Sequence, residues 1–302
     1  MRAELCAALM AHADRPEMVF LTGDLGFMAL EPLRDRMGDR FINCGIGEQN
    51  MVGVAAGLAR EGLEPWVYTI APFCYARAFE QIRNDICLHG LPVRLLGNGG
   101  GYGYGVMGPT HHALEDYGVL LTLPNLTAYV PAFNEDVIAV IGSAAVSPGP
   151  SYIRLGRGER PAGAVLPAYA PWRRLTRGDG PVVVAVGPLA GAAMAALAEL
   201  PVRPELWVVS ELPLATVAPP RAFAESIAAS RRLCVVEEHV GQGGLAQMLA
   251  VWALNAGIRV DGFRHQHARG YPSGLYGSQN FHRRESMLDP DSIRDAVLEL
   301  AA

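Results

Sequence analysis

The chain has 302 residues, of which 50% are hydrophobic and 18% are charged, and its formal net charge is −5. This length predicts about two domains, and the composition is typical of a globular protein. The chain has no run of basic residues and no apolar stretch near the roughly 20 residues that cross a bilayer. These properties argue against a partner nucleic acid and against a membrane.

The cysteines and the first residues of the chain bear on the cellular compartment of the protein. Five cysteines are scattered without a Cys-x-x-Cys pair: Cys6, Cys44, Cys74, Cys87 and Cys234. An odd, unpatterned set is typical of reduced thiols. The first residues show no signal-peptide pattern. We expect a cytoplasmic protein.

In the first half of the chain, short apolar segments alternate with helical patterns. We expect helices over residues 2–12 and 75–86 and from residues 48 and 134, and strands over residues 19–22, 40–43, 65–70, 93–97, 126–130 and 151–155. Apolar strands alternating with helices predict a mainly parallel sheet that is covered on both faces.

The second half repeats this alternation after a segment rich in proline and glycine. We expect strands over residues 182–186, 206–210, 233–237 and 259–263, and helices over residues 190–200, 221–230, 244–255 and from Asp289-Pro290. An aspartate followed by proline is a typical helix start. The prediction is an α/β protein of two consecutive doubly wound, mainly parallel-sheet domains: residues 1–160, a linker over 161–178, and residues 179–302.

Residues 45–50 carry the most informative pattern, Gly-Ile-Gly-Glu-Gln-Asn. A glycine turn joins a short strand to an apolar helix and presents Glu48 at the head of that helix. Free N–H groups and the helix dipole stabilise a carboxylate there. On this pattern alone, Glu48 is equally well explained as a helix-start residue or as a functional carboxylate.

Further segments follow Glu48 in a fixed order. They read Thr-Ile-Ala-Pro-Phe (69–73), Arg-Ala-Phe-Glu-Gln-Ile-Arg-Asn (77–84), a glycine-rich run (97–105), Gly-Pro-Thr-His-His (108–112) and Tyr-Ile-Arg-Leu-Gly-Arg (152–157). Together they resemble the pyrimidine-binding half of transketolase-like thiamine diphosphate enzymes. The rest of the chain resembles the transketolase C-terminal domain, so the resemblance covers the whole chain.

The resemblance implies a cofactor site. Glu48 matches the glutamate that hydrogen-bonds the cofactor's pyrimidine nitrogen and favours its imino tautomer. Phe73 matches the aromatic residue that stacks on the pyrimidine, although a core aromatic is the alternative. Arg77 lies where related enzymes place an arginine beside the cofactor and substrate, although it could be a surface charge. Ile46 and Tyr75 are expected to line the same pocket.

The resemblance also implies a second catalytic residue. His111 matches the histidine of the family's Asp-Gly-x-Thr-His-Gln signature, which hydrogen-bonds the substrate oxygen. A loop histidine suits this proton-handling role. His112 replaces the usual glutamine and is expected to contact substrate as well.

Departures from the family pattern concern the substrate. Met107 replaces an aspartate that contacts a sugar hydroxyl, and Gly99 replaces a histidine that reaches toward the acceptor. Phe27 and Met28 replace small polar residues. We expect a wider and more apolar substrate entrance, lined by Phe27, Met28 and Met107.

Three arginines lie where relatives bind a substrate phosphate: Arg2, Arg154 and Arg157. The resemblance implies that they contact substrate, and an ordinary salt bridge is the alternative for each.

The family's metal-binding pattern is not found in this sequence. That pattern is Gly-Asp-Gly followed by an asparagine pair, and Gly-Asp-Leu-Gly at residues 23–26 is a different motif in a different place. The resemblance therefore implies no metal ligand here. It implies a separate N-terminal transketolase subunit that holds Mg²⁺ (or Ca²⁺) and the diphosphate, in an α2β2 assembly.

The predicted activity is transfer of a two-carbon ketol unit to an aldehyde or another, non-standard acceptor, either a small molecule or carrier-bound. The beta subunit of a 2-oxo acid dehydrogenase first component is the alternative with the same chemistry. A non-catalytic scaffold or nucleotide-binding module is the alternative from another class, because fold alone does not give function.

Overall fold

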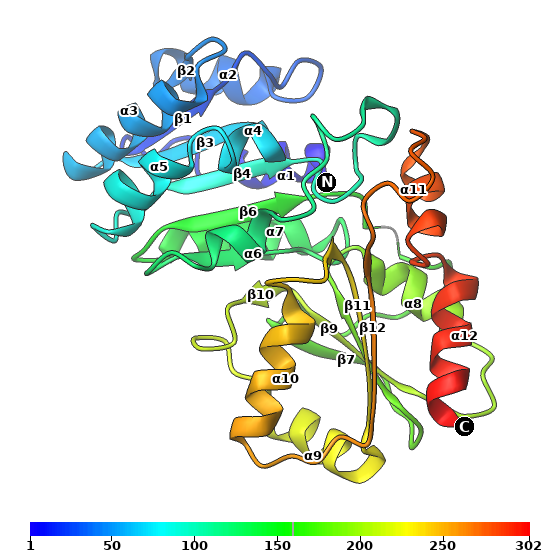
Figure 1. Ribbon diagram of the computed structural model, residues 1–302. Helices are drawn as coiled ribbons and strands as arrows, with labels where there is room; N and C mark the ends of the chain where they lie inside the picture. Colours follow the sequence, from blue (N-terminus) through cyan, green and yellow to red (C-terminus); the bar gives the residue numbers. More distant parts are fainter. Residues whose placement is uncertain (159) are drawn as a thin grey trace.

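The computed structural model describes residues 1–158 and 160–302, which form two sheets with helices on both faces (Figure 1). The first sheet has seven strands in the order β10-β5-β6-β4-β3-β1-β2. Neighbouring strands are parallel, except that β10 runs antiparallel to β5. These strands are β1 (Met18–Thr22), β2 (Phe41–Asn43), β3 (Glu64–Ile70), β4 (Arg94–Asn98), β5 (Thr127–Tyr129), β6 (Ser151–Leu155) and β10 (Glu211–Leu212).

Apolar helix faces cover this sheet from both sides. Leu5, Leu33 and Val140 come from the helices on one face, and Met51 and Ile82 come from the helices on the other. The first set is α1 (Arg2–Met10), α2 (Glu31–Met37) and α7 (Asp136–Val146). The second set includes α3 (Glu48–Arg60), α4 (Ala71–Tyr75), α5 (Phe79–Gln81), the π-helical turn η2 (Ile82–Cys87) and α6 (Asp116–Leu120).

The second sheet has five strands in the order β12-β11-β8-β9-β7, and only β7 is antiparallel to its neighbour. Its central strand β8 is buried along its whole length, as expected for a strand covered on both faces. The strands are β7 (Trp172–Thr176), β8 (Val182–Val186), β9 (Glu205–Val209), β11 (Arg232–Val240) and β12 (Gly262–Ala268). The helices are α8 (Leu189–Leu197), α9 (Arg221–Ser230), α10 (Leu245–Asn255), α11 (Gln279–Glu285) and α12 (Pro290–Ala301).

The predicted fold class is confirmed, but several boundaries differ. The predicted linker over 161–178 is wrong in its last part, because Trp172–Thr176 form β7 at the edge of the second sheet. The strand predicted at 259–263 lies instead at Gly262–Ala268, which is β12. Its residues are largely polar and do not give the apolar pattern that predicts a strand. The single helix predicted over 75–86 is broken into α4, α5 and η2.

The two halves of the chain are joined by more than the connecting segment. Strand β10 comes from the second half and pairs with β5 of the first sheet. One hydrophobic cluster includes residues of both sheets, such as Val67 and Val184. Within the described residues, no helix combines the length and apolarity needed to cross a bilayer.

Candidate functional site

Glu48 is the first residue of α3 and lies beyond the carboxyl ends of the first sheet's strands. The turn that precedes it contains Gly45, whose φ of 66° favours glycine. Met51, Val52 and Ala55 bury one face of α3 against the sheet. The Glu48 side chain is only 5% exposed, so its carboxylate needs a partner.

Arg77 supplies that partner and also contacts Phe73. Arg77 Nη1 lies 3.0 Å from each carboxylate oxygen of Glu48. The guanidinium carbon lies 3.6 Å from the centre of the Phe73 ring. A flat group with N–H donors is therefore held between an aromatic face and a buried carboxylate.

His111 lies against the same aromatic ring. Its ring centre is 5.2 Å from that of Phe73 and 5.7 Å from that of Tyr104. Its Nδ1 lies 2.9 Å from the hydroxyl of Thr110. The structure thus brings together Glu48, Phe73, Arg77 and His111, which the sequence predicts to share a site.

His112 has a different place from the one predicted. Its Nδ1 lies 2.8 Å from the Tyr271 hydroxyl, and its Nε2 lies 2.8 Å from the carbonyl oxygen of Gly105. Burial, with a contribution from nearby His282, lowers the pKa of His112 to about 4. Both ring nitrogens are engaged, so this histidine joins the glycine-rich loop to the second domain.

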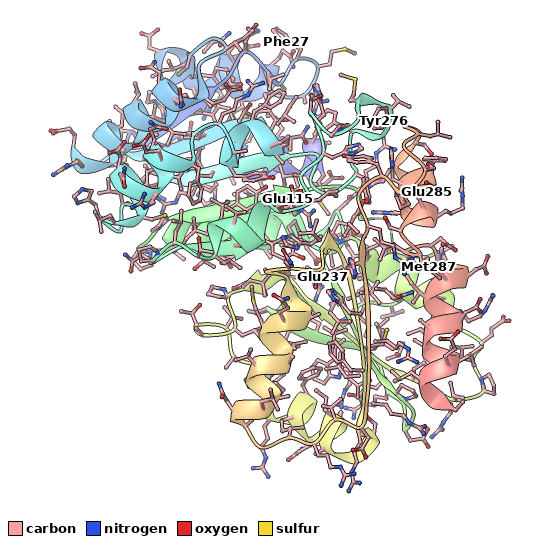
Figure 2. All side chains as sticks on the ribbon, viewed as in Figure 1. Phe27, Glu115, Glu237, Tyr276, Glu285 and Met287 are labelled. Atoms are coloured by element: carbon pink, nitrogen blue, oxygen red, sulfur yellow. The ribbon has the colours of Figure 1, made fainter. Side chains whose placement is uncertain are left out.

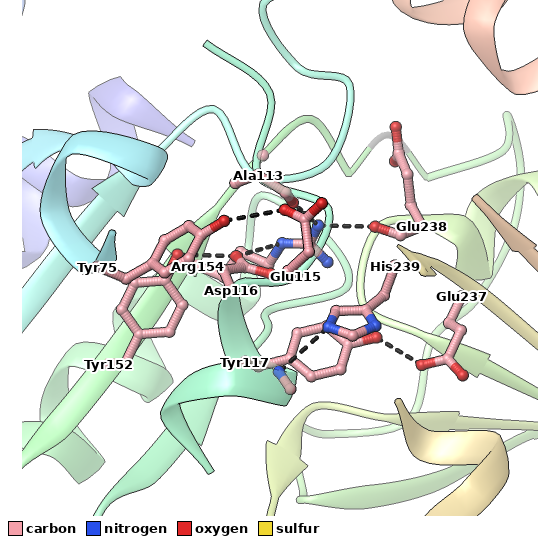
Figure 3. Close-up of polar contacts among 12 residues, drawn as sticks. Tyr75, Ala113, Glu115, Asp116, Tyr117, Tyr152, Arg154, Glu237, Glu238 and His239 are labelled. Carbon is pink, nitrogen blue, oxygen red and sulfur yellow. Dashed lines mark hydrogen bonds and ion pairs between the residues drawn. The ribbon is translucent and has the colours of Figure 1, made fainter. Parts of the chain in front are cut away.

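Tyr75 and Arg154 also differ from their predicted roles, and Figure 3 shows both in a polar network between the two sheets. The Tyr75 hydroxyl donates to Glu115 at 3.0 Å. Arg154 is buried, with its Nε 2.9 Å from Asp116 Oδ2. Arg154 Nη2 also donates to the Glu238 carbonyl at 2.7 Å. The Arg154 guanidinium is thus paired with groups of this chain.

This network crosses from one domain to the other, and the sequence did not predict it. Tyr117 donates to Glu237 at 2.6 Å, and the Gly118 amide donates to His239 at 3.1 Å (Figure 3). Burial alone would raise the pKa of Glu237, but hydrogen bonds from His265 and Tyr117 bring it below its usual value. Glu115 and Glu237 lie where the two domains meet (Figure 2).

Four apolar side chains that the sequence analysis assigns to the site are exposed. Met28 is 96% exposed and has a φ of 59°, and Phe27, Ile46 and Met107 are also largely exposed. Figure 2 shows Phe27 at the surface of the first domain. That they line an apolar substrate entrance stays a prediction.

The structure separates the three predicted phosphate-binding arginines. Arg2 donates to the Phe27 carbonyl at 2.8 Å and lines a cavity of about 170 Å³. Arg157 lines another cavity, of about 460 Å³, beside Arg160 and Arg283. Arg154 lies in the network between the sheets. The cavity beside Arg2 is also lined by Tyr104, whose ring centre lies 5.7 Å from that of His111.

No cluster of three or more His, Cys, Asp or Glu side chains that could hold a metal ion is found in residues 1–158 and 160–302.

Comparison with known proteins decides the family. Residues 3–161 match the family model described as transketolase, pyrimidine binding domain. The chain belongs to the transketolase family. This confirms the predicted resemblance.

Among relatives of this transketolase-family chain, a subunit of apulose-4-phosphate transketolase from Actinobacillus succinogenes is 30% identical over 279 residues, covering 90% of this chain and 88% of that protein. The 1-deoxy-D-xylulose-5-phosphate synthase of Myxococcus xanthus is 32% identical, covering 99% of this chain but 52% of that protein.

Solved structures extend the likeness over both domains. A split gene transketolase, solved as an inactive beta4 tetramer, matches with a TM-score of 0.82 and 28% identity, covering 99% of this chain and 96% of that one. Transketolase from Leishmania mexicana matches with a TM-score of 0.76 and 19% identity, covering 99% of this chain and 45% of that one. The second likeness shows the fold alone.

Proposed function

We propose that this chain is the pyrimidine-binding subunit of a split transketolase. On this proposal it transfers a two-carbon ketol unit from a ketose-type donor to an aldehyde or other acceptor. The relative that is named as a transketolase subunit is matched over 88% of its length. The chain spans only about half, 52%, of a relative that is not named as a subunit. The name of the first relative, a transketolase subunit, supports a second subunit that completes the enzyme.

The observation that carries this proposal is the position of the Arg77 guanidinium. It is a flat group with N–H donors, stacked on Phe73 and hydrogen-bonded to buried Glu48. An aminopyrimidine ring has the same flat shape and also carries an amino group. The residues present therefore fit the pyrimidine of thiamine diphosphate, with Phe73 stacking on it and Glu48 bonding to a ring nitrogen.

When bound, thiamine diphosphate supplies the carbon nucleophile for breaking and making carbon–carbon bonds. Glu48 orients the pyrimidine and holds a proton at its ring nitrogen, in a largely water-free position that strengthens the hydrogen bond. His111, in contact with Phe73, gives or takes a proton at the substrate's carbonyl oxygen.

The second subunit completes the site on this proposal. It holds the diphosphate and the Mg²⁺ (or Ca²⁺), and the assembly is α2β2. The names of the relatives, one a transketolase subunit and the other a split gene transketolase, support a two-subunit enzyme.

The exposed side chains of Phe27, Met28 and Met107 support an acceptor that is larger or less polar than the usual aldose phosphates. The apolar part of such an acceptor would lie against these side chains.

Replacing Glu48 by Gln tests this function. The variant keeps the size of the side chain but cannot hold the proton at the pyrimidine nitrogen. In the complex with the partner subunit, we expect hydrogen exchange at the cofactor's reactive carbon to slow by roughly 10²–10⁴. Glu61, an exposed residue just after α3, provides the control Glu61→Gln. Exchange within a few-fold of the wild-type rate would leave Glu48 as a helix-start residue only.

A further inference from the structure

The turn that carries His111, residues 105–112, is closed by the side chain of His112. At its start, the Gly108 amide donates to the Gly105 carbonyl at 3.2 Å. At its end, the amides of His111 and His112 both donate to the Gly108 carbonyl, at 3.0 and 3.2 Å. The His112 ring then reaches back to Gly105, whose carbonyl oxygen lies 2.8 Å from Nε2. One side chain thus spans the turn from its end to its start.

The partners of His112 fix its tautomer. A carbonyl oxygen can only accept, so Nε2 carries the hydrogen that Gly105 accepts. Burial lowers the pKa of His112 to about 4, so the ring is neutral near pH 7 and Nδ1 has no hydrogen. Nδ1 lies 2.8 Å from the Tyr271 hydroxyl, which therefore donates to it. Burial raises the pKa of Tyr271 well above its ordinary value, so this hydroxyl keeps its proton.

The second domain holds Tyr271 in place. The segment between β12 and α11, which contains Tyr271, lies beside the glycine-rich loop (Figure 1). The Gly270 carbonyl accepts from the Tyr102 hydroxyl at 2.9 Å, and that hydroxyl also lies 2.9 Å from Ser286 Oγ. The rings of Tyr102 and Tyr271 both pack against His112, with ring centres 5.2 and 5.7 Å away. The Tyr271 hydroxyl therefore has a fixed position from which to donate.

We propose that Tyr271 is a positioning residue: its hydroxyl holds the His112 ring across the turn, and the closed turn holds His111 at the substrate's carbonyl oxygen. This inference rests on the proposed function, because it assigns a residue that acts through the proposed catalytic histidine. Glu48 is held outside this turn, by α3 and by Arg77. Tyr271 should therefore affect proton transfer at the substrate and leave activation of the cofactor unchanged.

Replacing Tyr271 by Phe keeps the ring and removes the donor. His112 is 3% exposed, so its Nδ1 becomes a buried acceptor without a partner, which weakens the closed turn by roughly ten-fold. In the full chain, we expect amide hydrogen exchange at His111 and His112, measured by NMR, to speed up by roughly this factor. The amides of the central strand β3 should exchange at the wild-type rate. A general loss of stability would instead speed up exchange in β3 as well.

The complex with the partner subunit gives the kinetic readout. The probe is hydroxypyruvate, a two-carbon ketol donor, and the measurement is its single-turnover release of CO₂, which needs no acceptor. We expect Tyr271→Phe to slow this step about ten-fold, because a displaced proton-transfer group reacts slowly. Hydrogen exchange at the cofactor's reactive carbon should stay within about two-fold of the wild-type rate. Tyr276→Phe, at an exposed tyrosine of the same segment, should leave both rates unchanged.

The variant His111→Ala shows whether Tyr271 acts through that histidine. In this background, Tyr271→Phe should change the rate of CO₂ release by less than about two-fold, because the group that it positions is gone. A ten-fold loss in both backgrounds, an equal loss of cofactor exchange, or unchanged amide exchange at His111 would each overturn the inference. Absence of cofactor exchange or of CO₂ release in the wild-type complex would overturn the proposed function. The amide exchange of the chain alone would still decide whether Tyr271 holds the turn.

Discussion

Arg77 occupies the place that we assign to the cofactor's pyrimidine, so cofactor and guanidinium compete. Its side chain is 44% exposed and can move into solvent. Arg77→Ala should tighten thiamine diphosphate binding to the complex by roughly 3- to 30-fold. This factor corresponds to the free energy of the partly exposed ion pair and the cation–π contact that the cofactor must otherwise displace. Calorimetric titration of the two proteins measures this.

Arg83→Ala is the matched control, because Arg83 is an exposed arginine in the π-helical turn η2 that follows Arg77 in the chain. It should leave the cofactor affinity unchanged. Weaker binding in Arg77→Ala would show instead that Arg77 holds the cofactor, as the sequence alone predicts.

His112 lies outside the group formed by Glu48, Phe73, Arg77 and His111, and it makes the stability of the protein depend on pH. Its pKa is about 4 in the folded chain, against an ordinary 6.5. As pH falls from 6.5 to 4, the unfolded chain takes up this proton and the folded chain does not, so stability falls by roughly 3 kcal/mol. Above pH 6.5 this contribution is fully present.

We expect His112→Gln to flatten the dependence of unfolding free energy on pH between 6.5 and 4, as measured by urea denaturation. Part of the slope should remain, because burial also lowers the pKa of His282. His89→Gln, at an exposed histidine, should keep the wild-type slope. An unchanged slope in His112→Gln would contradict the buried, neutral state of His112.

Glu48, Phe73 and His111 are predictable from the sequence because each lies within a contiguous motif. Tyr75 and Arg154 are not, because their partners come from elsewhere in the chain. Tyr75 bonds to Glu115, and the Arg154 guanidinium reaches the backbone of Glu238. Residue type alone cannot distinguish a phosphate-binding arginine from one used in the fold.

At the scale of elements, the glycine-rich loop depends on glycines that allow close approach of side chains from the second domain. Gly101 has a φ of 63°, and a Cβ there would lie 2.7 Å from Cδ of Glu238. Gly101→Ala should therefore destabilise the protein by roughly 1–3 kcal/mol in chemical denaturation.

Gly142 in α7 is the control for this prediction, because a Cβ there meets nothing within 4 Å. Gly142→Ala should stabilise the protein by up to about 1 kcal/mol through helix propensity. Equal effects of the two substitutions would show that Glu238 does not constrain the loop.

The sequence predicts the apolar central strands well, because burial on both faces gives runs such as Val182–Val186. It misses the edge strands β7 and β10 and misplaces the edge strand β12, although it predicts β2 at the edge of the first sheet. Strand β7 carries two arginines, and β12 carries two histidines and a glutamine. Such strands are stabilised by pairing with a neighbour, which an apolar pattern does not show.

At the scale of the whole molecule, the second domain holds the glycine-rich loop of the first, which leads to His111. The Tyr102 backbone amide donates to a carboxylate oxygen of Glu238 at 3.0 Å. Further along the same loop, His112 Nδ1 lies 2.8 Å from the hydroxyl of Tyr271. Strand β10 adds a backbone connection between the domains. The second domain thus positions His111 without contributing a residue to the group formed by Glu48, Phe73, Arg77 and His111.

The central claim is that this chain supplies the pyrimidine half of a cofactor site that a partner subunit completes. Calorimetric titration with thiamine diphosphate and Mg²⁺ tests it most directly, on the chain alone, on the partner alone and on their complex. We expect tight binding by the complex and no measurable binding by this chain alone. Tight binding by the isolated chain, or none by the complex, would contradict it.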